Sequence, residues 1–303
     1  MNMNVTFEQQ GKAFNAQFSS EAKTFDASYE NLHLVNAIAG IAPDDIASAG
    51  ITGDIELSAS AIASHAFAGN KGITSLSAPN VTSVGEYGFY NSPGMKSVYL
   101  PACISINNYC FTNMVNTILA LPECTSVGTY SFTECKQIVQ LDLPQCKTIG
   151  NGSFKACTKI AKLNLPKCQT IGNSCLAQIL ITELILPECT SIGNSSLSGL
   201  SKCTYVDLPK CTSIVNYALR NSPNLATLIL RSEKICTLSN YALNGTKIWN
   251  GTGHIYVPSA LIASYQAAAN WKTIHAKNPD TFRALEDYTV DGTITGELDP
   301  DKI

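Results

Sequence analysis

The sequence predicts an elongated solenoid of the α+β class, built mostly of short β-strands. Seven prolines recur at intervals of 21 or 22 residues, and Arg231 takes the same place one period later. Alternating apolar residues precede each proline, which is the pattern of a strand with one face turned inward. A period this short and constant indicates coils that bury their apolar face only by stacking on their neighbours. The repeated prolines are Pro79, Pro101, Pro122, Pro144, Pro166, Pro187 and Pro209.

Each period contains two predicted strands and one large core side chain. The first strand ends at the proline, as after Leu141 and Leu143, because proline has no N–H to donate to a sheet. A second inward residue such as Ile149 follows five residues later, and the Gly or Asn after it, here Gly150, predicts a turn with positive φ. Ten residues after the proline stands Phe or Leu, as at Phe154, which we expect to fill the core.

The repeat divides the chain into three predicted parts. About nine coils occupy residues 51–258, an N-terminal β segment occupies residues 1–50, and a C-terminal helical cap with an acidic tail occupies residues 259–303. Ser259 is placed to cap a helix that runs to about Trp271. We expect the apolar side of this helix to cover the last coil, because a terminal coil otherwise exposes its core and its strand edge.

The clearest period resembles a known repeat family. It reads LDLPQCKTIG from Leu141 to Gly150 and continues through Phe154 and Cys157. This pattern resembles the BspA-type leucine-rich repeat, over about residues 55–258. Leu replaces Phe at positions 176, 197 and 219, a change of volume that a core tolerates. The resemblance implies a leucine-rich-repeat solenoid that acts in adhesion or recognition at surfaces.

The two flanks carry weaker resemblances. Spaced aromatic residues among polar ones resemble the N-terminal leader of Firmicutes prophage structural proteins, and residues 283–293 resemble the closing segment of BspA-repeat proteins of gut bacteria and their prophages. Such a leader implies attachment to a larger assembly by adding strands to a partner's sheet edge. The competing interpretation is a plain cap on the first coil. The candidate assembly residues are Phe7, Phe14, Phe18 and Phe25.

The twelve cysteines allow two interpretations, a disulfide or metal framework and a ladder of small buried side chains. There is no CxxC pair, and the four histidines form no zinc-like spacing with the cysteines. Free cysteine is among the most buried residue types, so we favour the ladder and expect no metal. Its members stand two residues after the prolines, at Cys103, Cys124, Cys146, Cys168, Cys189 and Cys211.

Composition argues against several classes of function. The net charge is −3 and only 14% of residues are charged, which gives no electrostatic footprint for nucleic acid. The sequence contains no run of 18 apolar residues, so we expect no insertion into a membrane. The N-terminus has neither the basic region nor the apolar core of a secretion signal. No histidine stands at a repeated position beside a nucleophile and no phosphate loop occurs, so we expect neither an enzyme nor a cofactor.

Two functions remain open. In the first, the protein is a bacteriophage virion component, a tail or capsid appendage that is assembled in the host cytoplasm. Its N-terminal segment would then bind other virion proteins, or copies of itself, and its solenoid would bind host-surface carbohydrate or protein. In the second, it is an adhesin of the bacterial cell surface or an intracellular interaction scaffold.

The predicted binding face lies on the first strand of each coil. Residues on either side of the inward apolar residue point outward, because side chains alternate along a strand. Aromatic, carboxylate and amide groups there suit carbohydrate or protein ligands, although an ordinary solvated sheet face would look the same. The candidate residues are Tyr99, Asp142, Lys162, Asn164, Glu183, Tyr205 and Asp207.

Overall fold

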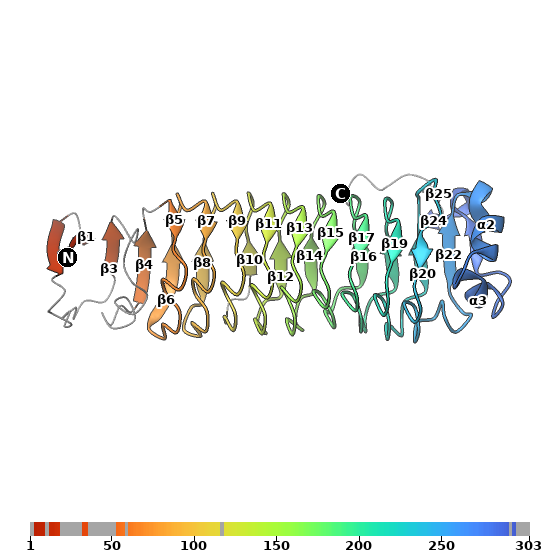
Figure 1. Ribbon diagram of the computed structural model, residues 1–303, viewed down its shortest axis with the longest axis horizontal. Coiled ribbons are helices and arrows are strands. Elements are labelled where there is room, and N and C mark those ends of the chain that lie inside the picture. The colour runs from red at the N-terminus through yellow and green to blue at the C-terminus, as the bar shows by residue number, and fades with distance from the viewer. Residues whose placement is uncertain are drawn as a thin grey trace.

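The protein is a straight rod of stacked coils with a hairpin at one end and a helical cap at the other (Figure 1). The computed structural model describes residues 3–9, 12–18, 32–35, 53–57, 60–115, 118–290 and 293–294.

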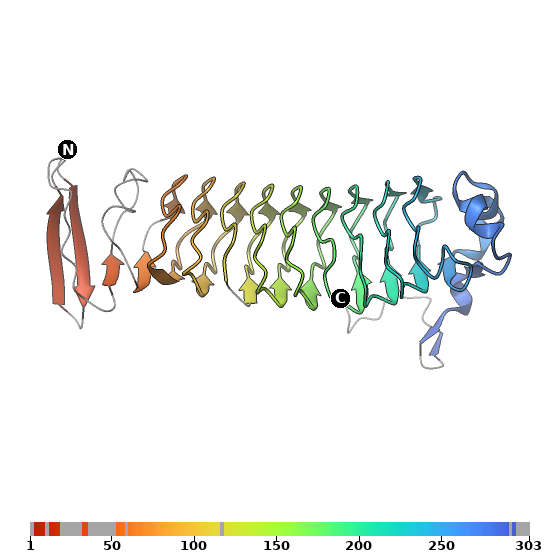
Figure 2. The ribbon, with the colours of Figure 1, turned by 90° about the horizontal axis from the view of Figure 1, so that it is seen from below.

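Each coil contributes one strand to each of two walls of the rod (Figure 2). The strands before the prolines form the first wall, whose outer surface we call the first-strand face. These are β4 (Gly53–Leu57), β6 (Ile73–Ser77), β8 (Ser97–Tyr99), β10 (Ile118–Ala120), β12 (Gln140–Asp142), β14 (Lys162–Asn164), β16 (Glu183–Ile185), β18 (Tyr205–Asp207), β20 (Thr227–Ile229) and β22 (His254–Val257).

The second wall is a single parallel sheet of nine two-residue strands, one from each coil. This number agrees with the nine coils that the repeat predicts. The strands are β5 (Ala61–Ile62), β7 (Ser83–Val84), β9 (Ser105–Ile106), β11 (Ser126–Val127), β13 (Thr148–Ile149), β15 (Thr170–Ile171), β17 (Ser191–Ile192), β19 (Ser213–Ile214) and β21 (Thr237–Leu238).

The coils stack in register, so that equivalent residues become neighbours. Leu141 of β12 pairs with Leu119 and Leu163 of the adjoining coils, and Ile149 pairs with Val127 and Ile171. The predicted aromatic position forms a column in the core, with neighbouring phenylalanine rings 4.8–5.2 Å apart and nearly parallel. Its members are Phe67, Phe89, Phe111, Phe132 and Phe154, continued by the buried Leu176, Leu197, Leu219 and Leu243.

The turn after the second strand differs from the prediction. Gly150 does not adopt positive φ; a Cβ there would lie 2.7 Å from the backbone of Gly128 and Thr129 in the preceding coil, so this glycine permits close approach of two backbones. The left-handed residue comes two positions later, with φ between 51° and 62°. It is Tyr87, Tyr109, Tyr130, Gly152, Ser174, Ser195, Tyr217 or Tyr241, according to the coil.

All twelve cysteines are buried free thiols, which confirms the predicted ladder of small core side chains. Each of the six repeated thiols lies close to the carbonyl two residues on, as Cys146 Sγ donates to Thr148 O at 3.3 Å. Burial raises the pKa of the Cys146 thiol from 9.0 to about 12, because the core disfavours the thiolate.

The C-terminal cap is made of two short helices where one was predicted. A 3₁₀ turn η1 (Ser259–Leu261) leads into α2 (Ile262–Ala267), and α3 (Trp271–His275) follows. The helix breaks because Ala268 is extended, with ψ 149°. The prediction that Ser259 caps the helix is wrong; its hydroxyl lies 3.3 Å from the Glu286 carboxylate, to which it donates.

The cap protects the last strand of the nine-stranded sheet with side chains. Cys236, just before β21, donates its N–H to the Tyr265 hydroxyl at 2.9 Å and accepts from the Trp271 indole at 2.7 Å. Asn270 Nδ2 donates to Leu238 O at 2.6 Å. The predicted covering of the last coil is therefore confirmed. The cap thus makes the hydrogen bonds to these main-chain N–H and C=O groups that a further coil would otherwise have made.

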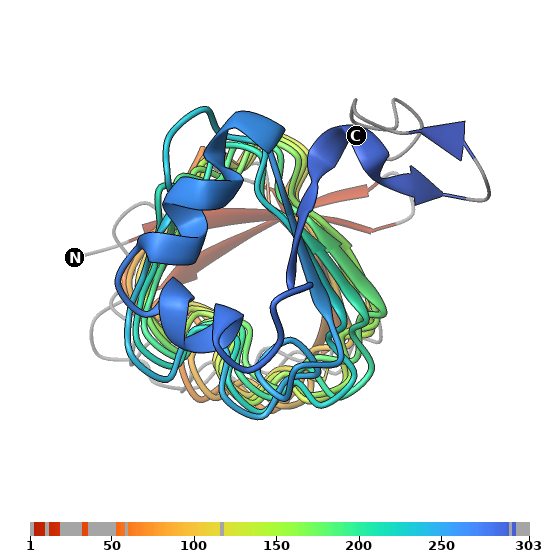
Figure 3. The ribbon, with the colours of Figure 1, turned by 90° about the vertical axis from the view of Figure 1, so that its right-hand side faces the viewer.

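Beyond α3 the chain rejoins the first wall and then leaves it. Strand β23 (Phe282–Ala284) pairs with β22, and a second 3₁₀ turn, η2 (Leu285–Asp287), precedes the hairpin of β24 (Thr289–Val290) and β25 (Thr293–Ile294). Figure 3 shows this hairpin beside the first-strand face at the cap end.

The N-terminal β segment extends the first wall. β3 (Leu32–Val35) pairs in parallel with β4, while β1 (Met3–Gln9) pairs antiparallel with both β3 and β2 (Lys12–Phe18). Phe7 pairs with Phe14 across the hairpin, and Phe25 lies outside the described residues. The boundaries proposed near residues 50 and 258 remain predictions.

We expect the buried thiols to make stability fall at alkaline pH. An unfolded cysteine ionises above pH 9, whereas Cys146 stays protonated to about pH 12, so the free energy of unfolding decreases as pH rises through this window. The loss is about 1.4 kcal/mol per pH unit for each such thiol. Denaturant unfolding of Cys146→Ala should show a deficit of about 1 kcal/mol at neutral pH that disappears about one to two units above the ordinary thiol pKa.

The matched control is Ser153→Ala, which removes another fully buried hydrogen-bonding group that does not titrate in this range. Its deficit should stay constant with pH. A constant deficit for Cys146→Ala, or a thiol titration of the unfolded protein that finds disulfides, would contradict the prediction.

Candidate binding surfaces

Most of the predicted binding residues lie on the exposed part of the first-strand face. Tyr99 is 59% exposed, and Lys162, Asn164 and Glu183 are also exposed. Asp142 is half-buried and accepts a hydrogen bond from Asn164 Nδ2 at 2.6 Å. These five residues come from four coils, and β12 and β14 hold two of them side by side.

Two predicted residues do not belong to this exposed face. Asp207 is 1% exposed, and its Oδ2 accepts hydrogen bonds from Arg231 Nη2 at 2.8 Å and Nε at 3.0 Å. The Tyr205 hydroxyl donates to the same oxygen at 3.1 Å, and Tyr205 itself is half-buried. The prediction of Asp207 as a solvent-facing ligand residue is therefore wrong.

The C-terminal segment explains this burial. Tyr288 follows η2, and its ring stacks on Tyr205 at 6.0 Å and meets the edge of Tyr256 at 4.7 Å. The segment thus covers the first-strand face over β18 to β22. Burial, with the Asp207 charge beside it, raises the pKa of Tyr205 well above its usual value, so the phenol remains a donor. Arg231 stands where other coils have proline, and that replacement was the sequence signal for an ion pair.

A second surface feature escaped sequence analysis. The left-handed position carries a row of aromatic rings along one corner of the rod, formed by His65, Tyr87, Tyr109 and Tyr130. Adjacent ring centroids are 4.8, 4.9 and 5.3 Å apart, and the planes lie within 18° of parallel. The recurrence of tyrosine eight residues after Pro79, Pro101, Pro122 and Pro209 was the available signal. We call this row, together with Tyr217 and Tyr241 at the same position of later coils, the tyrosine ladder.

The ladder is interrupted in the middle of the rod and resumes near the cap. Gly152 takes the next position, and a Cβ there would overlap the Tyr130 ring, so the missing side chain makes room for that ring. Ser174 and Ser195 follow. Tyr217 and Tyr241 then stack at 5.6 Å.

The described residues contain neither a metal-binding cluster nor a membrane-spanning helix. No group of three or more His, Cys, Asp or Glu side chains in the described part of the chain is arranged to hold a metal ion. Every helix that the structure describes is too short or too polar to cross a lipid bilayer. His65 stacks on Tyr87, and His275 lies against Phe282 in the cap.

Comparison with known families gives one match. The model for the BspA type leucine-rich repeat region matches residues 52–145 and 125–249, which together are about two thirds of the chain. No curated protein matched the sequence.

Several solved structures resemble the fold at low sequence identity. The pneumococcal vaccine antigen PcpA is 13% identical, with 76% of this chain and 78% of that chain covered and a TM-score of 0.43. The leucine-rich repeat protein TpLRR of T. pallidum is 13% identical, with 73% and 80% covered and a TM-score of 0.34. A leucine-rich cell surface protein of Faecalibacterium prausnitzii is 12% identical, with 86% and 90% covered and a TM-score of 0.34.

The buried ion pair gives a stability prediction. Asp207→Asn leaves the Arg231 guanidinium, whose side chain is 11% exposed, without its counter-charge, and we expect a loss of about 3 kcal/mol in the free energy of unfolding. The double variant Asp207→Asn/Arg231→Gln should recover part of that loss. Asp142→Asn makes the same change on the exposed part of the face and should stay within about 0.5 kcal/mol of wild type. Equal effects at the two positions would contradict the prediction.

Proposed function

The chain belongs to the BspA-type leucine-rich repeat family, and we propose that it is a non-enzymatic attachment protein of a bacteriophage virion. In this proposal it is a tail or capsid appendage. Its solenoid binds host-surface carbohydrate or protein, and its N-terminal hairpin binds other virion proteins. The observation that carries the binding role is the row of exposed and half-buried polar residues and Tyr99 on the first-strand face.

The geometry of that face suits an extended ligand. Equivalent positions repeat once per coil, a spacing of about 4.8 Å along the rod. Tyr99 offers an aromatic ring, Asn164 and Asp142 offer amide and carboxylate groups, and Lys162 and Glu183 offer charges of opposite sign. A ligand lying along the rod would meet apolar and hydrogen-bonding groups in turn, which is the composition of a specific protein surface.

The interior of the rod supports the same conclusion. The phenylalanine and leucine column, the stacked cysteines and the inward strand residues fill the space between the two walls. The side chains that differ most between coils are the outward ones. Recognition therefore falls to the outer faces, where substitution leaves the stacking of the core unchanged.

The N-terminal hairpin supports attachment to an assembly. In the sheet order β2-β1-β3-β4-β6-β8, β2 is the end strand, and β1 is its partner among the strands that the structure describes. An end strand offers main-chain donors and acceptors to a further strand. The resemblance of this flank to prophage structural proteins supports the virion as its setting. The closing segment, residues 283–293, resembles that of BspA-repeat proteins of gut bacteria and of their prophages, and is compatible with this setting. A cell-surface adhesin is the alternative.

We expect substitution of the first-strand face to weaken attachment without unfolding the rod. The variant carries alanine at Tyr99, Lys162, Asn164 and Glu183, and binding of the purified full-length protein to cells of the host strain is measured by sedimentation. The control carries alanine at Glu123, Lys147 and Lys155, which are exposed elsewhere on the coils. Equal binding by the two variants and wild type, with similar melting temperatures, would show that this face is not the binding surface.

The virion setting is tested on particles. Phage particles induced from the strain that carries the gene are purified on a density gradient, and we expect this chain by mass spectrometry and by immunogold labelling on the tail or capsid. Particles made with residues 1–29 deleted should lack it, while the truncated chain remains soluble in the lysate. Recovery of the wild-type chain in the cell envelope instead would favour the adhesin. An aggregated truncated chain would show that the hairpin is a cap.

A further inference from the structure

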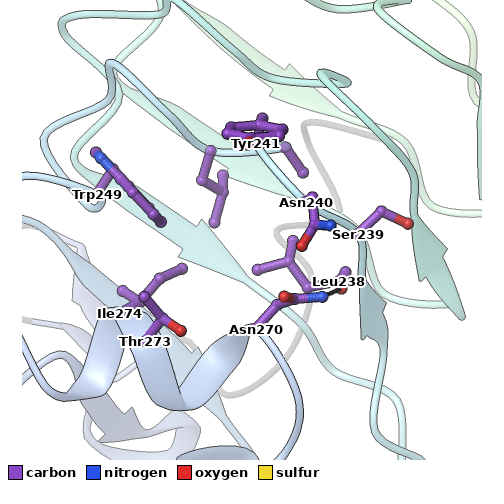
Figure 4. Close-up of a pocket in the computed structure, with 10 residues that line it drawn as sticks. Leu238, Ser239, Asn240, Tyr241, Trp249, Asn270, Thr273 and Ile274 are labelled. Carbon is purple, nitrogen blue, oxygen red and sulfur yellow. Dashed lines mark hydrogen bonds between the residues drawn. The ribbon is translucent and has the colours of Figure 1, made fainter.

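A partly open cavity of about 210 Å³ lies at the junction between the last coil and the cap (Figure 4). Residues 238–243 and Trp249 form one side of it, and α3 with Asn270 forms the other. Leu238, Leu243 and Ile274 are buried and supply an apolar floor. The site lies at the opposite end of the rod from the N-terminal hairpin of β1 and β2, and apart from the first-strand face, so it is independent of the function proposed above.

Tyr241 is the last rung of the tyrosine ladder. One side of its ring stacks on Tyr217, with centroids 5.6 Å apart and planes 8° from parallel. The rings of His65, Tyr87, Tyr109 and Tyr217 are each followed by a stacked ring of the next coil, but no coil follows Tyr241. Figure 4 shows this other flat side turned toward the cavity, and the residue is 55% exposed. The repeat therefore ends in an aromatic platform without a partner ring.

Trp249 supplies a second aromatic wall, held in place from outside the cavity. The Lys277 ammonium lies 3.4 Å from the centroid of the indole ring, a cation–π contact that fixes its orientation. Desolvation lowers the pKa of Lys277, because partial burial disfavours the charged ammonium. Trp249 is half-buried, whereas the only other tryptophan, Trp271, is fully buried in the cap.

The rim of the cavity is polar and uncharged. None of the residues that line it is acidic or basic. Asn270 Nδ2 donates a hydrogen bond to Leu238 O, which leaves the Asn270 Oδ1 as an acceptor. The side chains of Ser239, Asn240 and Thr273 make no hydrogen bond to any other residue that the structure describes, and Asn240 and Thr273 are exposed. The site thus combines hydroxyl and amide groups with a flat aromatic surface.

We propose that this cavity binds one neutral sugar residue, a terminal unit of a glycan, stacked on the free side of Tyr241. A pyranose has an apolar C–H face that fits an aromatic ring and a hydroxyl rim that fits amide and hydroxyl groups. The absence of charge in the lining disfavours phosphate and carboxylate ligands. The volume lies below the roughly 300–1,000 Å³ of sites for drug-sized molecules, which limits the ligand to about one ring.

The test uses the full-length protein and a panel of neutral methyl glycosides, including those of glucose, galactose, mannose and N-acetylglucosamine. Saturation-transfer NMR at roughly 10 mM ligand detects binding with a Kd in the millimolar range, and we expect a response from at least one of them. The same glycoside should change tryptophan fluorescence, and Trp249→Phe should abolish that change because Trp271 is sealed in the core. No response from any glycoside would overturn the proposal.

The decisive variant is Tyr241→Asn, because Asn tolerates the positive φ of this position and removes the ring. Affinity should fall at least about tenfold. Tyr109→Asn is the matched control, since Tyr109 is a ladder tyrosine with φ 56° far from the cap, and it should bind as wild type.

Thr273→Val tests the rim of the cavity without changing the shape of the side chain, and it should also weaken binding. Wild-type affinity for Tyr241→Asn, or an equal loss for Tyr109→Asn, would refute the site, as would a nucleoside that binds there more tightly than any glycoside.

Discussion

The structure depends on backbone hydrogen bonding between coils that are one strand spacing apart. Each coil donates to and accepts from its neighbours, as where Gly150 N donates to Val127 O and Gly172 N donates to Ile149 O. At this spacing the residue at any position touches the same position of the next coil. Flat rings, small thiols and leucines can each pack against a copy of themselves and therefore form columns along the rod. A glycine is needed where the backbones of two coils approach most closely. The requirement for self-compatible neighbours explains why the core is so repetitive.

The repeat made most of the fold predictable. Alternation before each proline located the first strands, and residues such as Ile149 and Phe154 were correctly assigned to the core. The turn was misjudged because glycine serves two purposes, positive φ and close approach, and Gly150 illustrates the second. A tyrosine in the left-handed region contradicts intrinsic preference, so stacking between coils, not local propensity, decides that position.

The candidate site was harder to predict for a physical reason. A repeat specifies which side chains point outward, but it does not specify what later folds over them. Tyr99 and Asn164 are open to solvent as predicted, whereas Asp207 is covered because the segment ending in Tyr288 returns to the same face. Contacts between a flank and a distant coil leave no periodic trace. The cavity beside Tyr241 arises in the same way, from the meeting of the array with a cap of different sequence pattern.

The way the cap closes the array has a consequence for how such proteins change length. Tyr265 and Trp271 bind the N–H and the carbonyl of Cys236, and Asn270 binds the carbonyl of Leu238. Main-chain groups are alike in every coil, so these contacts do not depend on which repeat comes last. Duplication or loss of a whole coil would present the cap with equivalent groups. The number of coils is therefore not restricted by the way helices α2 and α3 close the second wall, so that wall can gain or lose a whole repeat and keep the same closure.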